Sequence, residues 1–139
     1  MNKLLTLLLF TTLLISCSSD NDNPLTSNTD PQKGDKVTTE QITGKYELSE
    51  LNFDNGNLGT FEDKIQLTFN ADKSGEEFNP RTLKKTSFSW AYNNRVISFT
   101  HSIHGSVNAW FDKTTLKYKT YAKPEYPNEI GTYSYKKLN

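Results

Sequence analysis

Cysteine, methionine and histidine are scarce in this chain of 139 residues, which contains one cysteine, one methionine and two histidines. A single cysteine excludes a disulfide within the chain, because a disulfide needs two thiols. Lysine and arginine number 16, as do aspartate and glutamate, so the formal net charge is zero. The sequence therefore has neither the basic excess of a nucleic-acid-binding protein nor an acidic excess for a basic partner.

Motifs that carry enzyme chemistry are also missing: there is no nucleophile elbow, phosphate-binding loop, zinc pattern or dinucleotide fingerprint. Glu76 and Glu77 are adjacent, and in a strand their carboxylates point to opposite faces, whereas a glycosidase pair faces one cleft. His101 and His104 are three residues apart, which in a strand also means opposite faces, and no third metal ligand accompanies them. We therefore expect no enzyme, no metal site and no cofactor, with one histidine partly buried and the other in a turn.

The one cysteine, Cys17, lies in a stretch that explains its position. Residues 1–3 carry one positive charge, and residues 4–15 are apolar except for three threonines. This run is too short for a stable membrane-spanning helix but suits the core of a signal peptide. Residues 14–17 (LISC) resemble the bacterial lipobox, which implies cleavage before Cys17 and acylation of that residue as a membrane anchor. The alternative is a plain secretory signal in which the cysteine is incidental.

The residues after Cys17 are polar. Residues 18–22 (SSDND) resemble the serine-and-acid signal that sends Bacteroidota lipoproteins to the outer face of the outer membrane; the alternative is an ordinary flexible tether. Up to about Glu40, only Leu25 and Val37 are large and apolar. Such a segment cannot bury enough apolar surface to offset its ordering entropy, which predicts disorder. We expect a signal peptide over residues 1–16, the lipidated cysteine and a disordered linker over 17–40, and one domain over 41–139.

Aromatic residues are plentiful in that domain, because nearly all of the seven tyrosines, eight phenylalanines and two tryptophans follow residue 45. Aromatic and β-branched residues favour strands, and alternation of apolar and polar residues replaces helical periodicity here. Near Ser49 and Glu50 the apolar face of the first strand shifts, which predicts a bulge. Asn93 and Asn94 predict a tight hairpin. The predicted strands are residues 44–53, 64–69, 76–79, 85–92, 96–103, 106–111, 115–121 and 129–138.

Eight short strands with tight connections predict an all-β fold. An antiparallel sheet of this length that is apolar on one face tends to curl and close. We therefore expect an eight-stranded antiparallel up-and-down barrel in which the first strand pairs with the last.

The order of the motifs resembles the lipocalin-like domains of Bacteroidota lipoproteins, and the resemblance covers nearly all of residues 42–139. Such domains begin with Gly-x-Trp, and here Tyr46 stands at the tryptophan position, which in the family packs at the barrel base. Lys136 and Lys137 stand where lipocalins carry an arginine on the last strand. The resemblance implies structural roles for these positions and carries over no ligand-contacting residue. The remaining motifs are the strand and turn of residues 65–75, the strand–hairpin–strand of 88–99 and the Gly-Thr-Tyr-x-Tyr strand of 131–135.

Aromatic side chains are the candidate binding residues. Those on faces assigned to the interior form either a wall for a small apolar or aromatic ligand or a packed core, and bulky residues on short strands favour the core. Trp110 is out of phase with its apolar neighbours, so it is either exposed for a sugar or protein contact or packed beneath the loop of residues 123–128. The interior candidates are Phe69, Phe88, Trp90, Phe99, Phe111 and Tyr118.

The sequence leaves two functions open. In one, the chain is a lipid-anchored outer-membrane protein, on the periplasmic or the cell-surface side, whose barrel mouth binds a small apolar or aromatic ligand. In the other, the barrel is rigid and filled, and its outer surface binds a partner protein or a glycan. The resemblance to lipocalins favours the first, although fold alone does not establish function.

Overall fold

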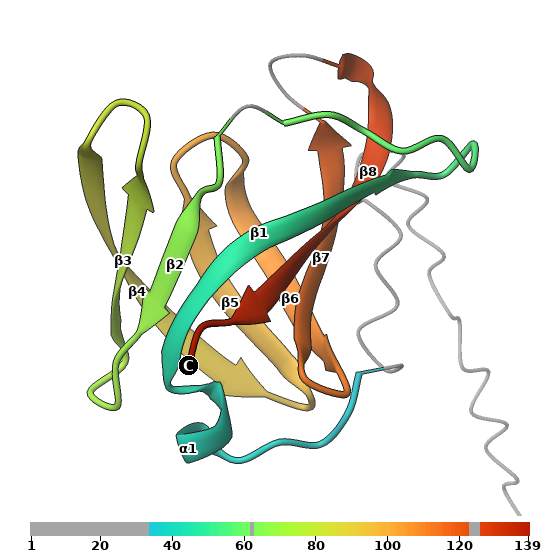
Figure 1. Cartoon of the computed structure of the whole chain (residues 1–139). Helices are drawn as coiled ribbons and strands as arrows, with labels where there is room; N and C mark the ends of the chain where they lie inside the picture. Colours follow the sequence, from blue (N-terminus) through green and yellow to red (C-terminus); the bar gives the residue numbers. More distant parts are fainter. Residues whose placement is uncertain (1–33, 62, 123–125) are drawn as a thin grey trace, which may run out of the picture.

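The computed structural model describes residues 34–61, 63–122 and 126–139, which form a closed antiparallel barrel of eight strands in chain order (Figure 1). The predicted signal peptide, Cys17 and the linker up to residue 33 lie outside the described residues. A short helix, α1 (Thr39–Ile42), precedes the barrel. The strands are β1 (Gly44–Phe53), β2 (Gln66–Phe69), β3 (Ser74–Asn79), β4 (Lys84–Asn93), β5 (Val96–His101), β6 (Gly105–Asp112), β7 (Thr115–Ala122) and β8 (Tyr126–Lys137).

Strand pairing confirms the predicted up-and-down barrel, because each strand pairs with its sequence neighbours and β1 pairs with β8. The pairing of β1 with β8 shifts between Leu48 and Glu50, which confirms the predicted bulge. The extra residue lets Leu48 and Leu51 both be buried although they are three residues apart.

The turn between β4 and β5 confirms the predicted hairpin, with a shift of one residue. Asn93 pairs with Val96, and the two residues between them have positive φ, 47° for Asn94 and 68° for Arg95. This conformation matches the twist of a two-residue hairpin.

Strand β5 ends earlier than predicted. In the predicted strand of residues 96–103, Ile103 would share a face with Ile97 and Phe99, but β5 ends at His101 and the Ile103 side chain is 43% exposed. The chain turns after His101, and the positive φ of Gly105 (72°) starts β6 in the opposite direction.

The barrel has two different ends (Figure 1). At the helix end lie α1 and the turns that join β2 to β3, β4 to β5 and β6 to β7. At the hairpin end lie the β3–β4 and β5–β6 hairpins, and the connection between β1 and β2 crosses this end. These two names are used below.

Residues 34–42 cover the helix end. The N–H of Asp35 donates to the carbonyl of Phe111 at 2.8 Å, and the N–H of Val37 donates to the Tyr92 hydroxyl at 3.0 Å. Thr38 caps α1 through a capping box with Gln41, which satisfies two backbone donors. Asp35 and Val37, which the sequence predicts to belong to the disordered linker, therefore form hydrogen bonds with the barrel.

Tyr46 packs at the helix end, where the resemblance to lipocalins implied a structural role. Its side chain is fully buried, and its hydroxyl donates to the carbonyl of Ile42 at 2.7 Å. The ammonium of Lys137 lies 5.7 Å from the centre of the Tyr46 ring, which is within cation–π range.

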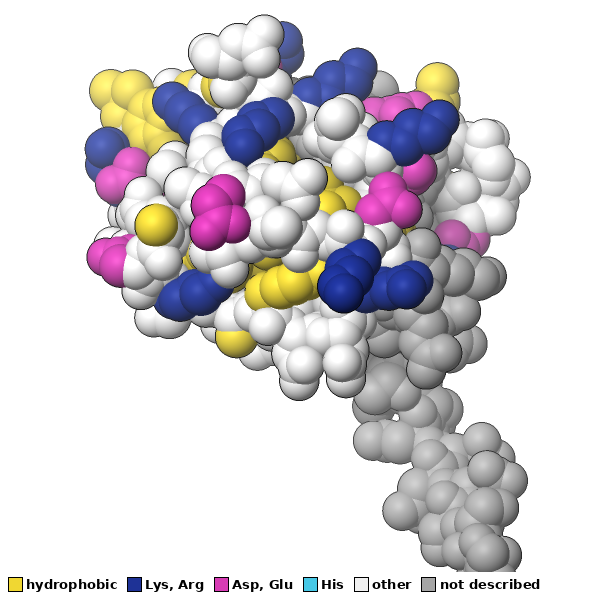
Figure 2. Space-filling view, turned by 90° about the horizontal axis from the view of Figure 1, so that it is seen from below, with side chains coloured by type: hydrophobic (Ala, Val, Ile, Leu, Met, Phe, Trp, Pro, Cys, Tyr) yellow, Lys and Arg dark blue, Asp and Glu magenta, His cyan; other side chains and the backbone are white. Residues whose placement is uncertain are grey.

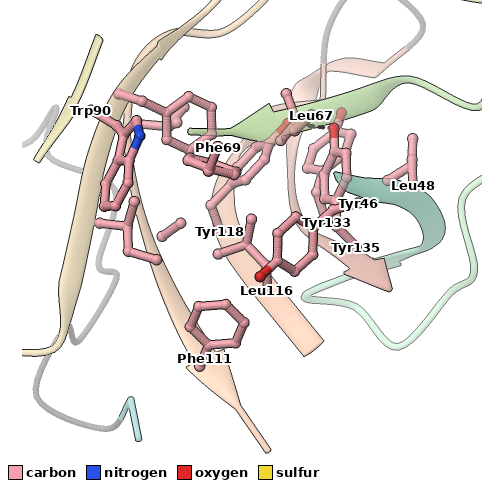
Figure 3. Packing of buried hydrophobic residues seen from close by; sticks show 14 of the residues in the cluster. Tyr46, Leu48, Leu67, Phe69, Trp90, Phe111, Leu116, Tyr118, Tyr133 and Tyr135 are labelled. Carbon is pink, nitrogen blue, oxygen red and sulfur yellow. Dashed lines mark hydrogen bonds between the residues drawn. The ribbon is translucent and has the colours of Figure 1, made fainter. Parts of the chain in front are cut away.

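Aromatic rings fill the middle of the barrel (Figure 3). The ring of Phe69 lies edge-on against those of Phe88 and Phe99, at centroid distances of 5.4 Å for each, and against Trp90 at 5.7 Å. Edge-to-face contacts of this kind add to the free energy of burying each ring. Alternation along the strands supplies these rings, because every second residue points inward.

Candidate ligand-binding site

The six aromatic candidates all belong to the buried core, and the structure brings them together. Phe88 and Phe99 are 5.1 Å apart between ring centroids, and Phe99 is 6.2 Å from Tyr118. The indole N–H of Trp90 donates to the carbonyls of Asn70 and Ser74, which holds the β2–β3 turn. They contact one another and further buried rings, such as Tyr46 beside Phe111 and Tyr133 beside Tyr118.

Trp110 lies on the outer face of β6 and is half-buried. Gly34 covers part of it, because a Cβ placed on Gly34 would lie 2.7 Å from the Trp110 Cβ. The sequence left open whether Trp110 is exposed or packs beneath residues 123–128. The structure shows that Gly34 is one of the residues that lie against it.

Besides tyrosines, the described residues include two ionisable side chains that are buried inside the barrel, Glu77 and His101, with 4% and 2% of their surface exposed. Alternation along β3 turns Glu77 inward, whereas Glu76 faces outward and pairs with Lys85 at 3.0 Å. The two glutamates therefore point to opposite faces, as predicted. Sequence reasoning did not identify Glu77 as an interior residue, although its position two residues after Gly75 in an alternating strand was the available signal.

The Glu77 carboxylate bridges two hairpins. It accepts hydrogen bonds from the N–H of Ser102, at 2.8 Å, and from the Ser102 hydroxyl. Its Oε2 also lies 3.7 Å from Nδ1 of His101. Strand β3 is thereby linked to the turn between β5 and β6.

A gap in the sheet explains why this bridge exists. Strands β4 and β5 pair only from Trp90 to Asn93, opposite Phe99 to Val96. Toward the hairpin end β4 continues to pair with β3, and β5 with β6, but not with each other. The two hairpins separate there, and the Glu77–Ser102 contact spans the gap.

The two histidines are neighbours, which corrects the prediction of opposite faces. Their ring centroids are 4.7 Å apart, because β5 ends at His101 and the turn carries His104 back toward it. The ring of His104 also lies 4.7 Å from Tyr133, which stacks on Tyr118 at 5.1 Å. Within the described ranges, no group of three or more His, Cys, Asp or Glu side chains is placed to hold a metal ion.

A short hydrogen-bond chain links His101 to two tyrosines. Nδ1 of His101 accepts from the N–H of Ile103 at 3.2 Å, so we assign the ring proton to Nε2, which donates to the Tyr135 hydroxyl at 3.4 Å. The hydroxyls of Tyr135 and Tyr118 are 3.3 Å apart. Burial lowers the pKa of His101 to about 4 and raises the pKa values of Tyr118 and Tyr135. The three side chains are therefore neutral at neutral pH.

A hollow of about 250 Å³ opens at the gap between the two hairpins, and Glu77 contributes to its wall. The wall offers a carboxylate, an amide, hydroxyls and an ammonium group beside one apolar side chain, so it can bind a small molecule that donates hydrogen bonds. We call it the hairpin-end hollow. Its lining residues are Glu77, Asn79, Thr82, Lys84, Thr86, Ser102 and Ile103.

No protein-family model, curated protein or solved structure matches this chain. The fold class of an all-β, eight-stranded up-and-down barrel therefore stands on the structure alone. Among the residues that the structure describes, none belongs to a helix long and apolar enough to cross a membrane.

Proposed function

We propose that the chain is a lipid-anchored protein of the cell envelope whose barrel binds one small ligand in the hairpin-end hollow. The observation that carries the binding proposal is the burial of Glu77 at the gap between two hairpins. Burying a carboxylate costs free energy unless its oxygens form hydrogen bonds. A barrel stabilised only by the packing of apolar side chains would not need a carboxylate at this gap. Perturbed or buried ionisable groups in a concave site are characteristic of functional positions.

The lining residues indicate the class of ligand. Carboxylate, amide and hydroxyl oxygens accept hydrogen bonds, and the methyl groups of Ile103 and the threonines offer apolar contact. We therefore propose a small apolar or aromatic molecule that carries hydrogen-bond donors. The volume of about 250 Å³ lies just below the usual range for ligand pockets, so only a small molecule fits.

The anchor proposal rests on the lipobox-like residues 14–17 and is compatible with access to this hollow. Residues 18–33 separate Cys17 from Gly34, which lies at the helix end. Fully extended, this number of residues spans roughly 55 Å. A tether of this length would let the hairpin end, with its hollow, stay accessible away from the membrane.

The ligand is tested by native mass spectrometry of the protein purified from its source cells, with the hollow blocked in a variant. Thr86 lines the hollow, whereas its neighbour Ser87 is exposed on the outer face of β4. We expect a small molecule to co-purify with the unmodified chain and with Ser87→Trp, but not with Thr86→Trp. Retention of the same molecule by a folded Thr86→Trp variant, or its absence from the unmodified chain, would contradict the proposal.

A second candidate is a rigid barrel whose outer surface binds a partner protein or a glycan. The packing of the aromatic rings in the middle of the barrel favours it, as does the partial exposure of Trp110 on β6. In that case, Trp110→Ala would abolish capture of the partner from envelope extracts without unfolding the barrel. Trp90→Ala, in the core, would lower stability instead.

A further inference from the structure

A second hollow, of about 230 Å³, lies at the opposite end of the barrel, beside α1. Figure 2 views the molecule from this side and shows apolar side chains at the surface with lysine and arginine side chains around them. We call it the helix-end hollow. It is lined by Val37, Gln41, Tyr46, Phe111, Lys113, Thr114 and Lys137.

The helix-end hollow has an apolar and rigid floor. Tyr46 and Phe111 are buried, and their ring centroids are 6.0 Å apart. The Tyr46 hydroxyl is occupied by the carbonyls of Gln41 and Ile42, at 3.1 and 2.7 Å. The Tyr46 hydroxyl is therefore not free for a ligand, and Val37, which is half-buried above the two rings, is the apolar side chain that a ligand can touch.

Two lysines, one from a turn and one from the end of a strand, contribute ammonium groups to the same hollow. Lys113 lies in the β6–β7 turn with φ of 58°, and its N–H donates to the Asp35 carboxylate at 2.6 Å. Lys137, at the end of β8, donates from its ammonium to the carbonyl of Gln41 at 3.1 Å. In the described part of the chain, neither ammonium forms an ion pair.

The nearby acidic groups are already engaged. The Asp35 carboxylate accepts from the backbone of Lys113, and the Asp112 carboxylate pairs with Lys117 at 2.6 Å. An anion that enters the hollow therefore meets two ammonium groups that form no direct ion pair, although the carboxylates of Asp35 and Asp112 lie nearby and keep their negative charge. Charge-assisted hydrogen bonds from ammonium groups are among the stronger polar contacts in proteins.

We propose that the helix-end hollow binds a small amphipathic anion, an aromatic or short-chain carboxylate. The carboxylate lies between the ammonium groups of Lys113 and Lys137, and the apolar body lies on Val37, above the buried rings of Tyr46 and Phe111. The volume excludes a long acyl chain, and the apolar floor disfavours a fully hydrated inorganic anion. This site is separate from the hairpin-end hollow and does not depend on the function proposed above.

The test uses benzoate as the probe and saturation-transfer NMR on the full chain. The chain offers a matched control, because Lys136 precedes Lys137 on β8 and is exposed on the outer face of the barrel. We expect benzoate to bind with a dissociation constant of about 1 mM, as suits a ligand of this size. Lys113→Gln and Lys137→Gln should each weaken binding at least about fivefold, and Lys136→Gln less than about twofold.

Two further ligands test whether the charge or the shape of benzoate determines its binding to the helix-end hollow. Benzamide, which has the same shape without the charge, should bind at least about fivefold more weakly than benzoate. Inorganic phosphate should not displace benzoate, because it cannot use the apolar floor. The proposal is overturned if benzoate gives no saturable signal, if benzamide binds equally well, if phosphate displaces benzoate, or if Lys136→Gln weakens binding as much as Lys137→Gln. Thermal unfolding of each variant verifies that the barrel is intact.

Discussion

At the scale of single residues, the contact between Glu77 and His101 sets two effects against each other. A carboxylate 3.7 Å from Nδ1 would favour a protonated imidazole. Burial of the ring disfavours it, and Nδ1 already accepts the N–H of Ile103. Burial is the stronger effect, since the pKa of His101 is lowered to about 4. The imidazole is held neutral as part of the hydrogen-bond chain to Tyr135.

The lowered pKa of His101 predicts a loss of stability in mild acid. Above pH of about 6.5 the ring is neutral in both the folded and unfolded states, so its contribution is complete. As the pH falls from there to about 4, the unfolded state binds more protons and the free energy of unfolding falls. We expect a loss of about 2 kcal/mol between pH 7.5 and pH 5, measured by denaturant unfolding. The His101→Gln variant should lack this component; an identical pH dependence in both proteins would contradict the assignment.

Gly75 is the residue at which a single methyl group should matter most for packing. A Cβ there would meet the Phe88 ring and would lie 2.7 Å from the carbonyl oxygen of Thr68. Gly75→Ala should therefore lower the free energy of unfolding by about 2 kcal/mol through overpacking. Ser89→Ala, on the exposed face of β4, should change it by less than about 0.5 kcal/mol. Equal thermal unfolding midpoints for the two variants would refute this interpretation of the space around Gly75.

At the scale of elements, the segment before β1 is part of the folded unit. Gly34 is buried against Trp110, Val37 packs on the core, and α1 supplies the fully buried Ile42. Sequence composition predicted disorder up to residue 40, because Val37 is the only large apolar residue between Gly34 and Glu40. Here the contacts are mostly hydrogen bonds from the backbone, which composition does not register.

Two truncations separate the predicted tether from this segment. Removing residues 18–33 should leave the thermal midpoint unchanged, because the sequence of that stretch predicts no burial. Removing residues 18–39 should lower the free energy of unfolding by about 2 kcal/mol, since it deletes the hydrogen bonds of Asp35 and Val37 with the barrel. Two truncated chains with the same midpoint would show that residues 34–39 contribute nothing to stability.

At the scale of the whole molecule, the two ends of the barrel have different chemistry. The helix end combines an apolar floor with lysines, and the hairpin end combines a buried carboxylate with hydroxyl and amide groups. The N-terminal segment enters at the helix end. A chain anchored through Cys17 would therefore enter the barrel at the helix end.

The anchor itself is tested by Cys17→Ser. Without the thiol no acyl chain can be attached to sulfur, so we expect the variant to appear in the soluble fraction or to remain unprocessed. The measurement is cell fractionation with a high-salt wash, which removes proteins held only by charge. A Cys17→Ser protein that is processed and still pellets with membranes after the wash would exclude lipid attachment. Ser18→Ala, the neighbouring change, should leave fractionation as it is.

The sequence by itself determined the all-β class, the eight strands, the closure of β1 on β8 and the bulge after Leu48. These features depend on period-two alternation and turn residues, which are local signals. Only the tertiary structure decided that β4 and β5 separate near the hairpin end, that Glu77 bridges this gap to Ser102, and that His101 and His104 lie together. Both hollows likewise join residues from separate strands. Such arrangements depend on where the pairing between two strands stops, even two consecutive strands such as β4 and β5, and no local pattern along one strand encodes that point.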